Sequence, residues 1–567
     1  MRKSKRTISM LLVLLMTVSM LAMSACGAQA EEPAQTEQTK RKEIPTLTLY
    51  SDSASLLSGV VGGHRGEFFA EKGFNLEVWA YSKEKTNAIL ASGDLPDIMY
   101  VPKENLQALI EEGMILNLDE YQNKLPHLYS SGDCVEGALE NVRNNFSGGT
   151  GGLYGLPTYV GKESKASMLL NSTDRYSLKI RWDAYENIGA PEINGVWELI
   201  DVMEQMLDAC PEIDGVPMQG IALYDCSGYE CWRNMQAYFV WQGYGIDYLA
   251  YLLEANKTND TVSSILSKDS LYYEGLKWYN ECYRRGVLDP DSISSERASV
   301  LTRTEAGYVM VPGGNLLGPS PIFMEYLLPD TKIFYDSEAE LGRTHSLIAI
   351  KTNSVNIDEA LAFLDILCDP DALKLLVFGP DGGGILYSEG NNMYLTDRFL
   401  EYIKENGQMV GYPLDNGETF DYFNTGYLCN AGVETSFEDG KGNKRIYDVM
   451  GYSEYQEIAA ASDNFDAWKK TMGYNSWREL LADKNALCES SKIADLASYL
   501  QPDDQMKLLI SSLNDVIQNA SWKMVYAESD AEFEAAWNEM VSDCEGLGAN
   551  QVIEWASAII MEQASKK

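Results

Sequence analysis

The side chains of this chain that could do chemistry are carboxylates and aromatic rings. The 567 residues include 84 Asp and Glu, 34 Tyr and 11 Trp, but only three His. A glycosidase needs two carboxyl groups about 5 to 9 Å apart across a sugar, and no such pair stands out among so many. No Ser-His-Asp signature, metal-binding His pair or zinc pattern is present. The sequence therefore predicts no catalytic residue, no metal and no cofactor.

Aromatic residues are concentrated between positions 228 and 248, where amides and carboxylates are interspersed. Sugars present apolar C–H faces that stack on rings and hydroxyl groups that need hydrogen-bond partners. Trp232, Trp241 and Tyr244 are therefore candidate contacts for a sugar. The near-helical spacing of the rings around Trp241 also fits the buried face of a helix.

Strand-like and helix-like runs alternate in the first part of the chain, which implies a parallel sheet with right-handed crossovers. Ligands of such sheets gather at the carboxyl ends of the strands. Asp52 follows the first predicted strand, Tyr81 ends the second, and both are candidate contacts. The predicted strands are 46–50, 74–81 and 97–101, and the predicted helices are 65–72, 83–92 and 104–112.

The segment ASGDLPDI at 91–98 forms the turn after the second of these helices. Gly93 suits the left-handed residue that ends a helix, and Pro96 prevents its continuation. Ser92 and Asp94 are candidate ligand contacts in this turn. Structural punctuation alone would also explain Gly93 and Pro96.

The order and spacing of these segments resemble extracellular solute-binding proteins of family 1, the sugar-binding components of ABC importers. ASGDLPDI is followed by a helix, then by GMILNLDEY and GLYGLP, and the resemblance extends from about Thr46 to the C-terminus. It implies an α/β, periplasmic-binding-protein-like fold (type II) with two discontinuous lobes, a hinge and an interlobe cleft. The expected lobes are 44–157 plus 300–345 (N-terminal) and 158–299 plus 346–567 (C-terminal).

The resemblance also implies further ligand contacts. Tyr154 and Tyr159 match the segment that leads from one lobe to the other, although core tyrosines beside a hairpin turn would give the same pattern. Asn315 follows a pair of glycines in a turn that could offer backbone donors, and Tyr387 matches an aromatic residue after a glycine-rich loop.

Acidic residues near two turns have other expected roles. Many relatives carry a calcium loop after the helix that ends near Cys210, but Asp208 and Asp214 lack enough neighbouring oxygen ligands here, so calcium is not predicted. Asp289 and Asp291 flank a proline, where capping of the turn is their expected role.

The N-terminus reads as an export signal, because four basic residues precede an apolar run from Ile8 to about Met23. Met23 to Cys26 resemble a bacterial lipoprotein box, with Met in place of the usual Leu. The resemblance implies a signal peptide at 1–25 and a lipidated (palmitate-bearing) Cys26, with 26–43 as the lipidated cysteine and flexible tether. A plain signal peptide is the alternative.

Charge limits the partners. Four of the 45 basic residues lie in the signal, so the remaining 41 face 84 acidic residues, a net charge of −43. Such a surface repels phosphate, which excludes nucleic acid and favours a neutral ligand. Nine cysteines remain after Cys26; Cys226 and Cys231 could pair or be buried thiols.

The sequence thus predicts a monomeric substrate-binding lipoprotein, not an enzyme, on the extracytoplasmic face of the membrane of a Gram-positive-type bacterium. It would capture a carbohydrate, a neutral oligosaccharide, and deliver it to the permease subunits of an ABC importer. The alternatives are a secreted carbohydrate-active enzyme and a surface sensory or adhesive lipoprotein.

Overall fold

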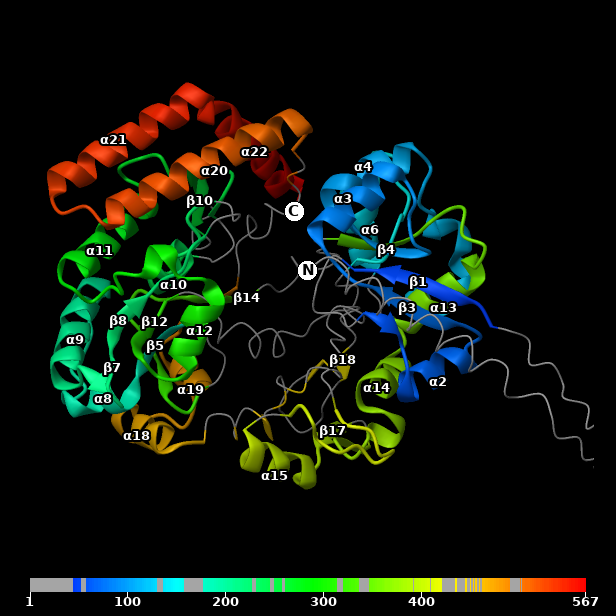
Figure 1. Ribbon diagram of the computed structural model, residues 1–567, viewed down its shortest axis with the longest axis horizontal. Coiled ribbons are helices and arrows are strands. Elements are labelled where there is room, and N and C mark those ends of the chain that lie inside the picture. Colours follow the sequence, from blue (N-terminus) through cyan, green and yellow to red (C-terminus); the bar gives the residue numbers. More distant parts are fainter. Residues whose placement is uncertain are drawn as a thin grey trace, which may run out of the picture. The chain divides into compact units, whose positions relative to one another are not determined.

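The computed structural model (Figure 1) describes most of the chain from residue 44 to residue 566. The residues outside this description are 1–43, 52–57, 130–135, 158–176, 227–230, 245–248, 257–260, 314–319, 336–345, 391, 408, 421–433, 436–443, 446–448, 450–451, 453, 456–457, 459–460, 490–499, 501 and 567.

Two separate hydrophobic cores define two lobes. The first core is built from residues between Leu47 and Leu156 and between Leu347 and Tyr452. The second is built from residues between Leu178 and Ile333 and between Trp468 and Ile560. Each lobe is therefore discontinuous in sequence, as expected for a two-lobed binding-protein fold.

A five-stranded sheet in the order β15-β4-β1-β3-β2 forms the centre of the first lobe. Strand β1 is parallel to β3 and β4, with Tyr50 in register with Trp79 and Met99, whereas β15 and β2 run antiparallel at the edges. Figure 1 shows these strands beside α13. The strands are β1 (Thr46–Tyr50), β2 (Gly59–Val60), β3 (Asn75–Trp79), β4 (Ile98–Pro102) and β15 (Ser346–Ile350).

Several local predictions for this lobe are confirmed. Strand β1 has the predicted bounds, and the helix α3 spans Lys83–Ser92 as predicted. Gly93 has φ 68° and its N–H donates to the carbonyl of Ile89, which closes the helix in the left-handed conformation. The other helices of the first lobe are α2 (Gly63–Glu71), α4 (Lys103–Glu111), η1 (Leu118–Lys124), α5 (Pro126–Tyr129), α6 (Glu136–Asn145), α13 (Ile357–Ile366), α14 (Pro370–Phe378), η3 (Pro380–Gly382) and α15 (Asp397–Asn406).

The second lobe contains strands that come from distant parts of the chain. Strand β8 (Gln219–Ala222) pairs in parallel with β12 (Val309–Pro312), and β5 (Leu178–Arg181) pairs antiparallel with β13 (Phe323–Tyr326). Strand β5 also lies beside β12, and an isolated parallel bridge joins Ile221 to Leu288.

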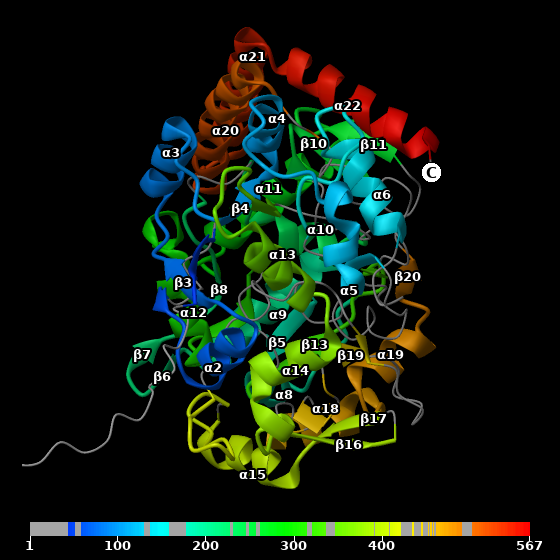
Figure 2. The same ribbon diagram turned by 90° about the vertical axis from the view of Figure 1, so that its right-hand side faces the viewer.

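Helices surround these strands. Between residues 182 and 305 they are α8 (Trp182–Asn187), α9 (Val196–Ala209), α10 (Met235–Trp241), α11 (Leu271–Arg284), η2 (Ser292–Ser294) and α12 (Arg297–Glu305). Near the C-terminus they are α18 (Asp463–Met472), α19 (Trp477–Asp483), α20 (Asp504–Val525), α21 (Asp530–Leu547) and α22 (Ala549–Lys566). Helices α20, α21 and α22 pack on one another and lie together in both ribbon views (Figure 1 and Figure 2).

Short antiparallel or parallel pairs complete the structure. They are β6 (Glu212–Ile213) with β7 (Val216–Pro217), β10 (Leu253–Asn256) with β9 (Leu249–Ala250) and β11 (Thr261–Ser264), β14 (Ile333–Tyr335) with β20 (Leu487–Glu489), β16 (Leu386–Glu389) with β17 (Asn392–Leu395), and β18 (Glu434–Thr435) with β19 (Lys444–Arg445).

The predicted lobe boundaries are wrong after residue 299. Val300 and Val311 belong to the second core, although 300–345 was assigned to the first lobe. Leu347 and Phe399 belong to the first core, although 346–567 was assigned entirely to the second. The physical reason is strand pairing, because β12 pairs with β8 and β15 pairs with β4. The sequence of a single strand does not show which other strand it will pair with.

The last helices follow the predicted pattern. Ser529 is the N-cap of α21 and its hydroxyl accepts from the N–H of Glu532. Phe533, Trp537 and Met540 are buried on one face of α21. Within the described part of the chain, no helix combines the length and apolar character needed to cross a membrane.

Candidate functional site

The turn at 91–98 separates a structural aspartate from exposed polar residues. Asp97 is 7% exposed; its carboxylate accepts hydrogen bonds from the N–H (3.0 Å) and hydroxyl (2.9 Å) of Thr48 and from the hydroxyl of Ser354 (2.7 Å). Lys351 Nζ lies 3.6 Å from the same carboxylate. Burial alone would raise the pKa of Asp97, but these hydrogen bonds and the charge of Lys351 hold the pKa below its usual value. Asp97 therefore ties β1 to the segment after β15.

Ser92 and Asp94 lie at the surface of the same turn. The hydroxyl of Ser92 donates to the carbonyl of Ile89 (3.2 Å) and accepts from the N–H of Asp94 (3.3 Å). Both side chains are exposed. Both side chains are therefore accessible to a ligand, and their ligand role stays a prediction.

An aromatic cluster lies at the carboxyl ends of β1 and β3; we call it the strand-end patch and define it by Tyr50, which is buried, Trp79 and Lys85, which are partly buried, and Tyr81, which is exposed. Tyr81 is 38% exposed, and its ring centroid lies 6.3 Å from that of Tyr50. Lys85 Nζ lies 4.8 Å from the Trp79 ring centroid and 5.5 Å from that of Tyr50. Tyr81 therefore offers an accessible ring at this edge of the sheet, and its ligand role stays a prediction.

A second exposed pair of rings, which we call the tyrosine pair, consists of Tyr387 and Tyr394 on the hairpin β16–β17. The two residues are direct cross-strand partners, and their rings stack with centroids 5.4 Å apart at 28°. Tyr387 is 44% exposed. Burial, together with the charges of Glu389 and Asp397, raises the pKa of the Tyr387 phenol, so it stays a hydrogen-bond donor at neutral pH.

The prediction that Trp232 and Trp241 contact a ligand is wrong, because both side chains belong to the second core. Trp232 is 0% exposed and packs edge-on against Tyr279 (5.2 Å) and Trp522 (5.0 Å). Trp241 is 1% exposed and packs edge-on against Trp278 (5.9 Å). The helix α10, which contains Trp241, has no charged residue and is buried at every position. A helix that is apolar all round is enclosed by its neighbours.

The remaining predicted contacts divide into two groups. Tyr244 is partly buried and packs edge-on against Phe239 (5.8 Å), and Tyr154 is partly buried against the first core. Both stay predictions. The other four, Asp52, Tyr159, Asn315 and the lipidation site Cys26, lie outside the described residues.

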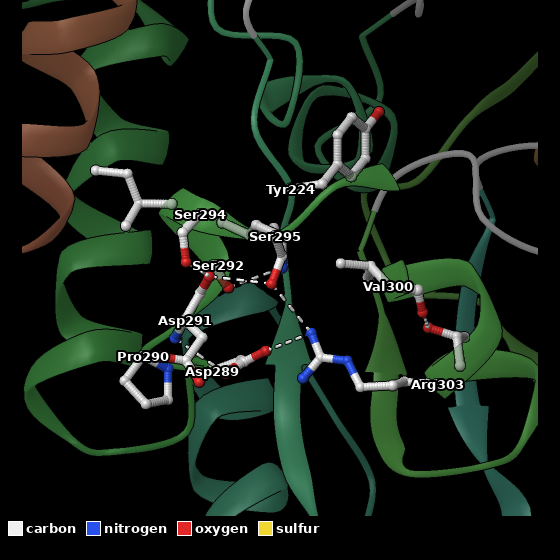
Figure 3. A network of polar contacts seen from close by, with 12 residues as sticks. Tyr224, Asp289, Pro290, Asp291, Ser292, Ser294, Ser295, Val300 and Arg303 are labelled. Atoms are coloured by element: carbon white, nitrogen blue, oxygen red, sulfur yellow. Dashed lines mark hydrogen bonds and ion pairs between the residues drawn. The ribbon is translucent and has the colours of Figure 1, made fainter. Parts of the chain in front are cut away.

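Asp289 and Asp291, for which the sequence predicts a capping role, belong to a dense network of polar contacts in the second lobe (Figure 3). Asp289 is 1% exposed, lies 2.7 Å from Arg303 Nη2, and accepts a hydrogen bond from the N–H of Asp291 (3.1 Å). Ser292 Oγ accepts from the N–H of Leu223 (3.0 Å). The predicted capping role of Asp289 is confirmed, and the turn at 289–295 is fixed against the end of β8.

A cavity of about 570 Å³ lies between this turn and α20, and the sequence reading did not identify it. Asp225, which follows β8, lines it together with Trp522 from α20 and Tyr526, the C-cap of that helix. A signal was present: Gln518, Trp522 and Tyr526 recur at four-residue intervals and therefore share one face of a helix. We call it the α20 cavity.

Two further sequence questions receive structural answers. Cys226 and Cys231 are separate, buried thiols, and burial raises the pKa of Cys226 to about 12. The segment after α9 forms the hairpin β6–β7, with Asp214 and Gly215 at φ 52° and 77° in the turn. Among the described residues, no group of three or more His, Cys, Asp or Glu is placed to hold a metal ion.

Comparisons by sequence give no relative: no protein-family model matches, and no curated protein matches the chain. Solved structures do match. An HMO-binding solute-binding protein associated with an ABC transporter, from Bifidobacterium longum infantis, superposes with a TM-score of 0.59 at 12% identity, covering 92% of this chain and 99% of that one. The chain has the fold of extracellular solute-binding proteins.

Two other structures share this solute-binding fold over the same extent. The ABC-transporter substrate-binding protein FusA of S. pneumoniae, in complex with kestose, matches with a TM-score of 0.58 at 14% identity, covering 92% of this chain and 100% of that one. An extracellular solute-binding protein from Bifidobacterium longum subsp. infantis gives the same TM-score, identity and share of this chain, with 99% of its own length covered. All three are binding proteins by name.

Proposed function

We propose that this protein is the substrate-binding lipoprotein of an ABC importer and that it captures a neutral oligosaccharide in a cleft between its two lobes. The observation that carries the proposal is the match of nearly the whole chain, 92%, to nearly the whole length of solute-binding proteins. One of those proteins is named for binding HMO and another was solved with kestose.

Exposed aromatic rings in the first lobe support a carbohydrate ligand. The strand-end patch and the tyrosine pair each offer an accessible ring, Tyr81 at 38% and Tyr387 at 44% exposure. Lys85 belongs to the same patch as Tyr81, where it lies over the Tyr50 ring, and the charge of Glu389 acts on the Tyr387 phenol. Stacking on C–H faces with hydrogen bonds at the rim is the chemistry that a sugar requires.

The charge of the chain supports a neutral ligand. Acidic residues outnumber basic ones by 39 over the whole sequence. An anionic oligosaccharide would meet repulsion from this surface before it reached any local site. We therefore expect neutral oligosaccharides to bind more tightly than uronic acid oligomers of the same length.

A thermal-shift screen of the mature protein tests the proposal. Neutral mono- and oligosaccharides are compared at equal concentration, and hits are confirmed by calorimetric titration. A ligand present at 100 times its Kd adds about 2.7 kcal/mol to the free energy of unfolding. Absence of any shift across neutral oligosaccharides, or release of reducing sugar with turnover, would reject the proposed binding function.

Membrane attachment and delivery need their own test. Lipid on Cys26 would hold the protein beside its permease, and the polar residues 27–43 would act as the tether. In the native host, Cys26→Ser should remove incorporated palmitate and move the protein from the membrane fraction to the medium. Retention of Cys26→Ser in the membrane would contradict lipid anchoring.

A further inference from the structure

The hairpin β16–β17 has one buried face and one outer face (Figure 2). Leu386, Met393 and Leu395 belong to the first core, where each is at most 6% exposed. Because side chains alternate across a strand, Tyr387 and Glu389 lie together on the opposite face, and both are exposed. The outer face is thus accessible, on a hairpin whose inner face is held by the core.

Cross-strand pairing arranges the outer face into a pair of rings and a pair of polar side chains. Tyr387 is opposite Tyr394, with ring centroids 5.4 Å apart, and Glu389 is opposite Asn392. Glu389 follows Tyr387 by two residues, so their Cα atoms stand about 6.6 Å apart along the strand. A sugar unit that lies on the Tyr387 ring can therefore reach the Glu389 carboxylate with its hydroxyl groups.

The base of the hairpin is fixed by hydrogen bonds. The carbonyl of Gly384 accepts from the hydroxyls of Thr396 (2.5 Å) and Tyr412 (2.8 Å). The N–H of Thr396 also donates to the carbonyl of Ile385 (2.8 Å). A surface that is already held in place loses little conformational freedom when a ligand binds to it.

The charges that act on the Tyr387 phenol are negative. Burial, together with the charges of Glu389 and Asp397, raises the pKa of this phenol. A carboxylate has only acceptor sites, so Glu389 needs hydrogen-bond donors from a ligand. Sugar hydroxyl groups supply such donors, whereas the carboxylate of a uronic acid supplies none and is repelled by like charge.

We infer that the outer face of the hairpin β16–β17 is a subsite for one unit of the proposed oligosaccharide and that Glu389 determines its specificity. The sugar unit stacks its C–H face on Tyr387 and donates two adjacent hydroxyl groups to the Glu389 carboxylate. The subsite thereby selects a neutral unit with free hydroxyl groups. This inference rests on the proposed binding function and assigns the preference for a neutral ligand to one residue.

Calorimetric titration of the mature protein with neutral trisaccharides provides the probe. Cellotriose, maltotriose, mannotriose, galactotriose and kestose are compared, and the tightest binder is used in all later measurements. If none of them binds, the proposed function fails and the subsite fails with it. If one binds, the Glu389 variant alone decides the subsite, so the two failures are distinguishable.

A charge-removing variant tests the role of the carboxylate. Glu389→Gln keeps the size of the side chain, and we expect it to bind the probe about tenfold more weakly, because hydrogen bonds to a charged acceptor are stronger than those to an amide. Glu401→Gln is the matched control, since it removes the same charge from an exposed position on α15 of the same lobe. Wild-type affinity in Glu389→Gln, or an equal loss in Glu401→Gln, would overturn the subsite.

Competition with an acidic sugar tests the specificity. Trigalacturonic acid displaces the probe, which is held at a fixed, saturating concentration. The acid concentration that displaces half of the probe should be about tenfold lower for Glu389→Gln than for wild type, because the variant binds the probe less tightly and repels the acid less. An unchanged concentration, or no displacement from the variant, would overturn the specificity role. Glu389 is exposed, so the thermal midpoint of the sugar-free variant should match that of wild type.

Discussion

Two groups of aromatic side chains in this protein have opposite surroundings. The rings around Trp232 and Trp241 fill the second core and are almost completely buried, whereas Tyr387 and Tyr394 stack on a hairpin of the first lobe with Tyr387 44% exposed. Both groups are rich in rings, so the number of rings does not distinguish packing from binding. The neighbouring residues do: α10 has no charged residue, while Glu389 follows Tyr387 on its strand.

Loss of a core ring gives the largest expected effect. Trp232→Ala should lower the free energy of unfolding by about 3 to 5 kcal/mol, since it empties a space enclosed by Tyr279 and Trp522. Urea denaturation followed by circular dichroism measures the change. Trp232→Phe should lower the free energy of unfolding by less than Trp232→Ala, because it keeps a ring in the core and the indole N–H of Trp232 has no hydrogen-bond partner among the described residues. A loss below about 1 kcal/mol for the alanine variant would place Trp232 outside the core.

The same contrast between buried and exposed side chains can be tested inside one turn. Asp97→Asn should cost about 2 kcal/mol, because Asp97 accepts charge-assisted hydrogen bonds from Thr48 and Ser354. Asp94→Asn, four residues from the N-terminal end of β4 and exposed, should change stability by less than about 0.5 kcal/mol. Equal losses from both variants would contradict the structural role assigned to Asp97.

The pH dependence of stability provides an independent measurement on Asp97. Its pKa is lower in the folded protein than in the unfolded chain, so the stabilisation is complete above the ordinary carboxyl pKa, about 4, and is lost as the pH falls through the folded value. The difference in unfolding free energy between wild type and Asp97→Asn should therefore shrink as the pH falls below about 4. A difference that stayed constant with pH would mean that the charge of Asp97 has no part in stability.

The tyrosine pair should respond in the opposite way to the core rings. Tyr387→Ala is expected to leave the free energy of unfolding within about 0.5 kcal/mol of wild type and to weaken the best oligosaccharide hit about fivefold, the effect of one lost ring contact. Titration calorimetry measures the affinity. Unchanged affinity would remove Tyr387 from the proposed site.

The smallest effect is expected for an exposed ring with no proposed role. Trp197 on α9 is 44% exposed, the same fraction as Tyr387. Trp197→Ala should alter stability by less than about 0.5 kcal/mol and leave oligosaccharide affinity unchanged. A loss of affinity equal to that of Tyr387→Ala would show that exposure of a ring, by itself, does not mark the binding surface.

Individual residues show how far the sequence could predict the site. The spacing of apolar residues and the placement of Gly93 were enough to bound α3 correctly. Tyr81 could be predicted because it lies at the carboxyl end of a strand, and its ring is exposed there. Trp241 is buried, which is the alternative that the near-helical spacing of the rings around it allowed, because the uncharged run at 235–241 forms a helix enclosed on every side. The α20 cavity was missed because Asp225 and Trp522 lie far apart in sequence and meet only through packing.

The sequence by itself determined the local elements: helices, strands and their caps depend on periodicity and on residues within a few positions of one another. Only the tertiary structure decided which lobe each strand joins and which rings lie inside. Val309 and Val311 pack in the second core because β12 pairs with β8, about 90 positions earlier. Such pairing depends on hydrogen bonds and burial between distant segments, and it cannot be predicted from the local pattern of either segment.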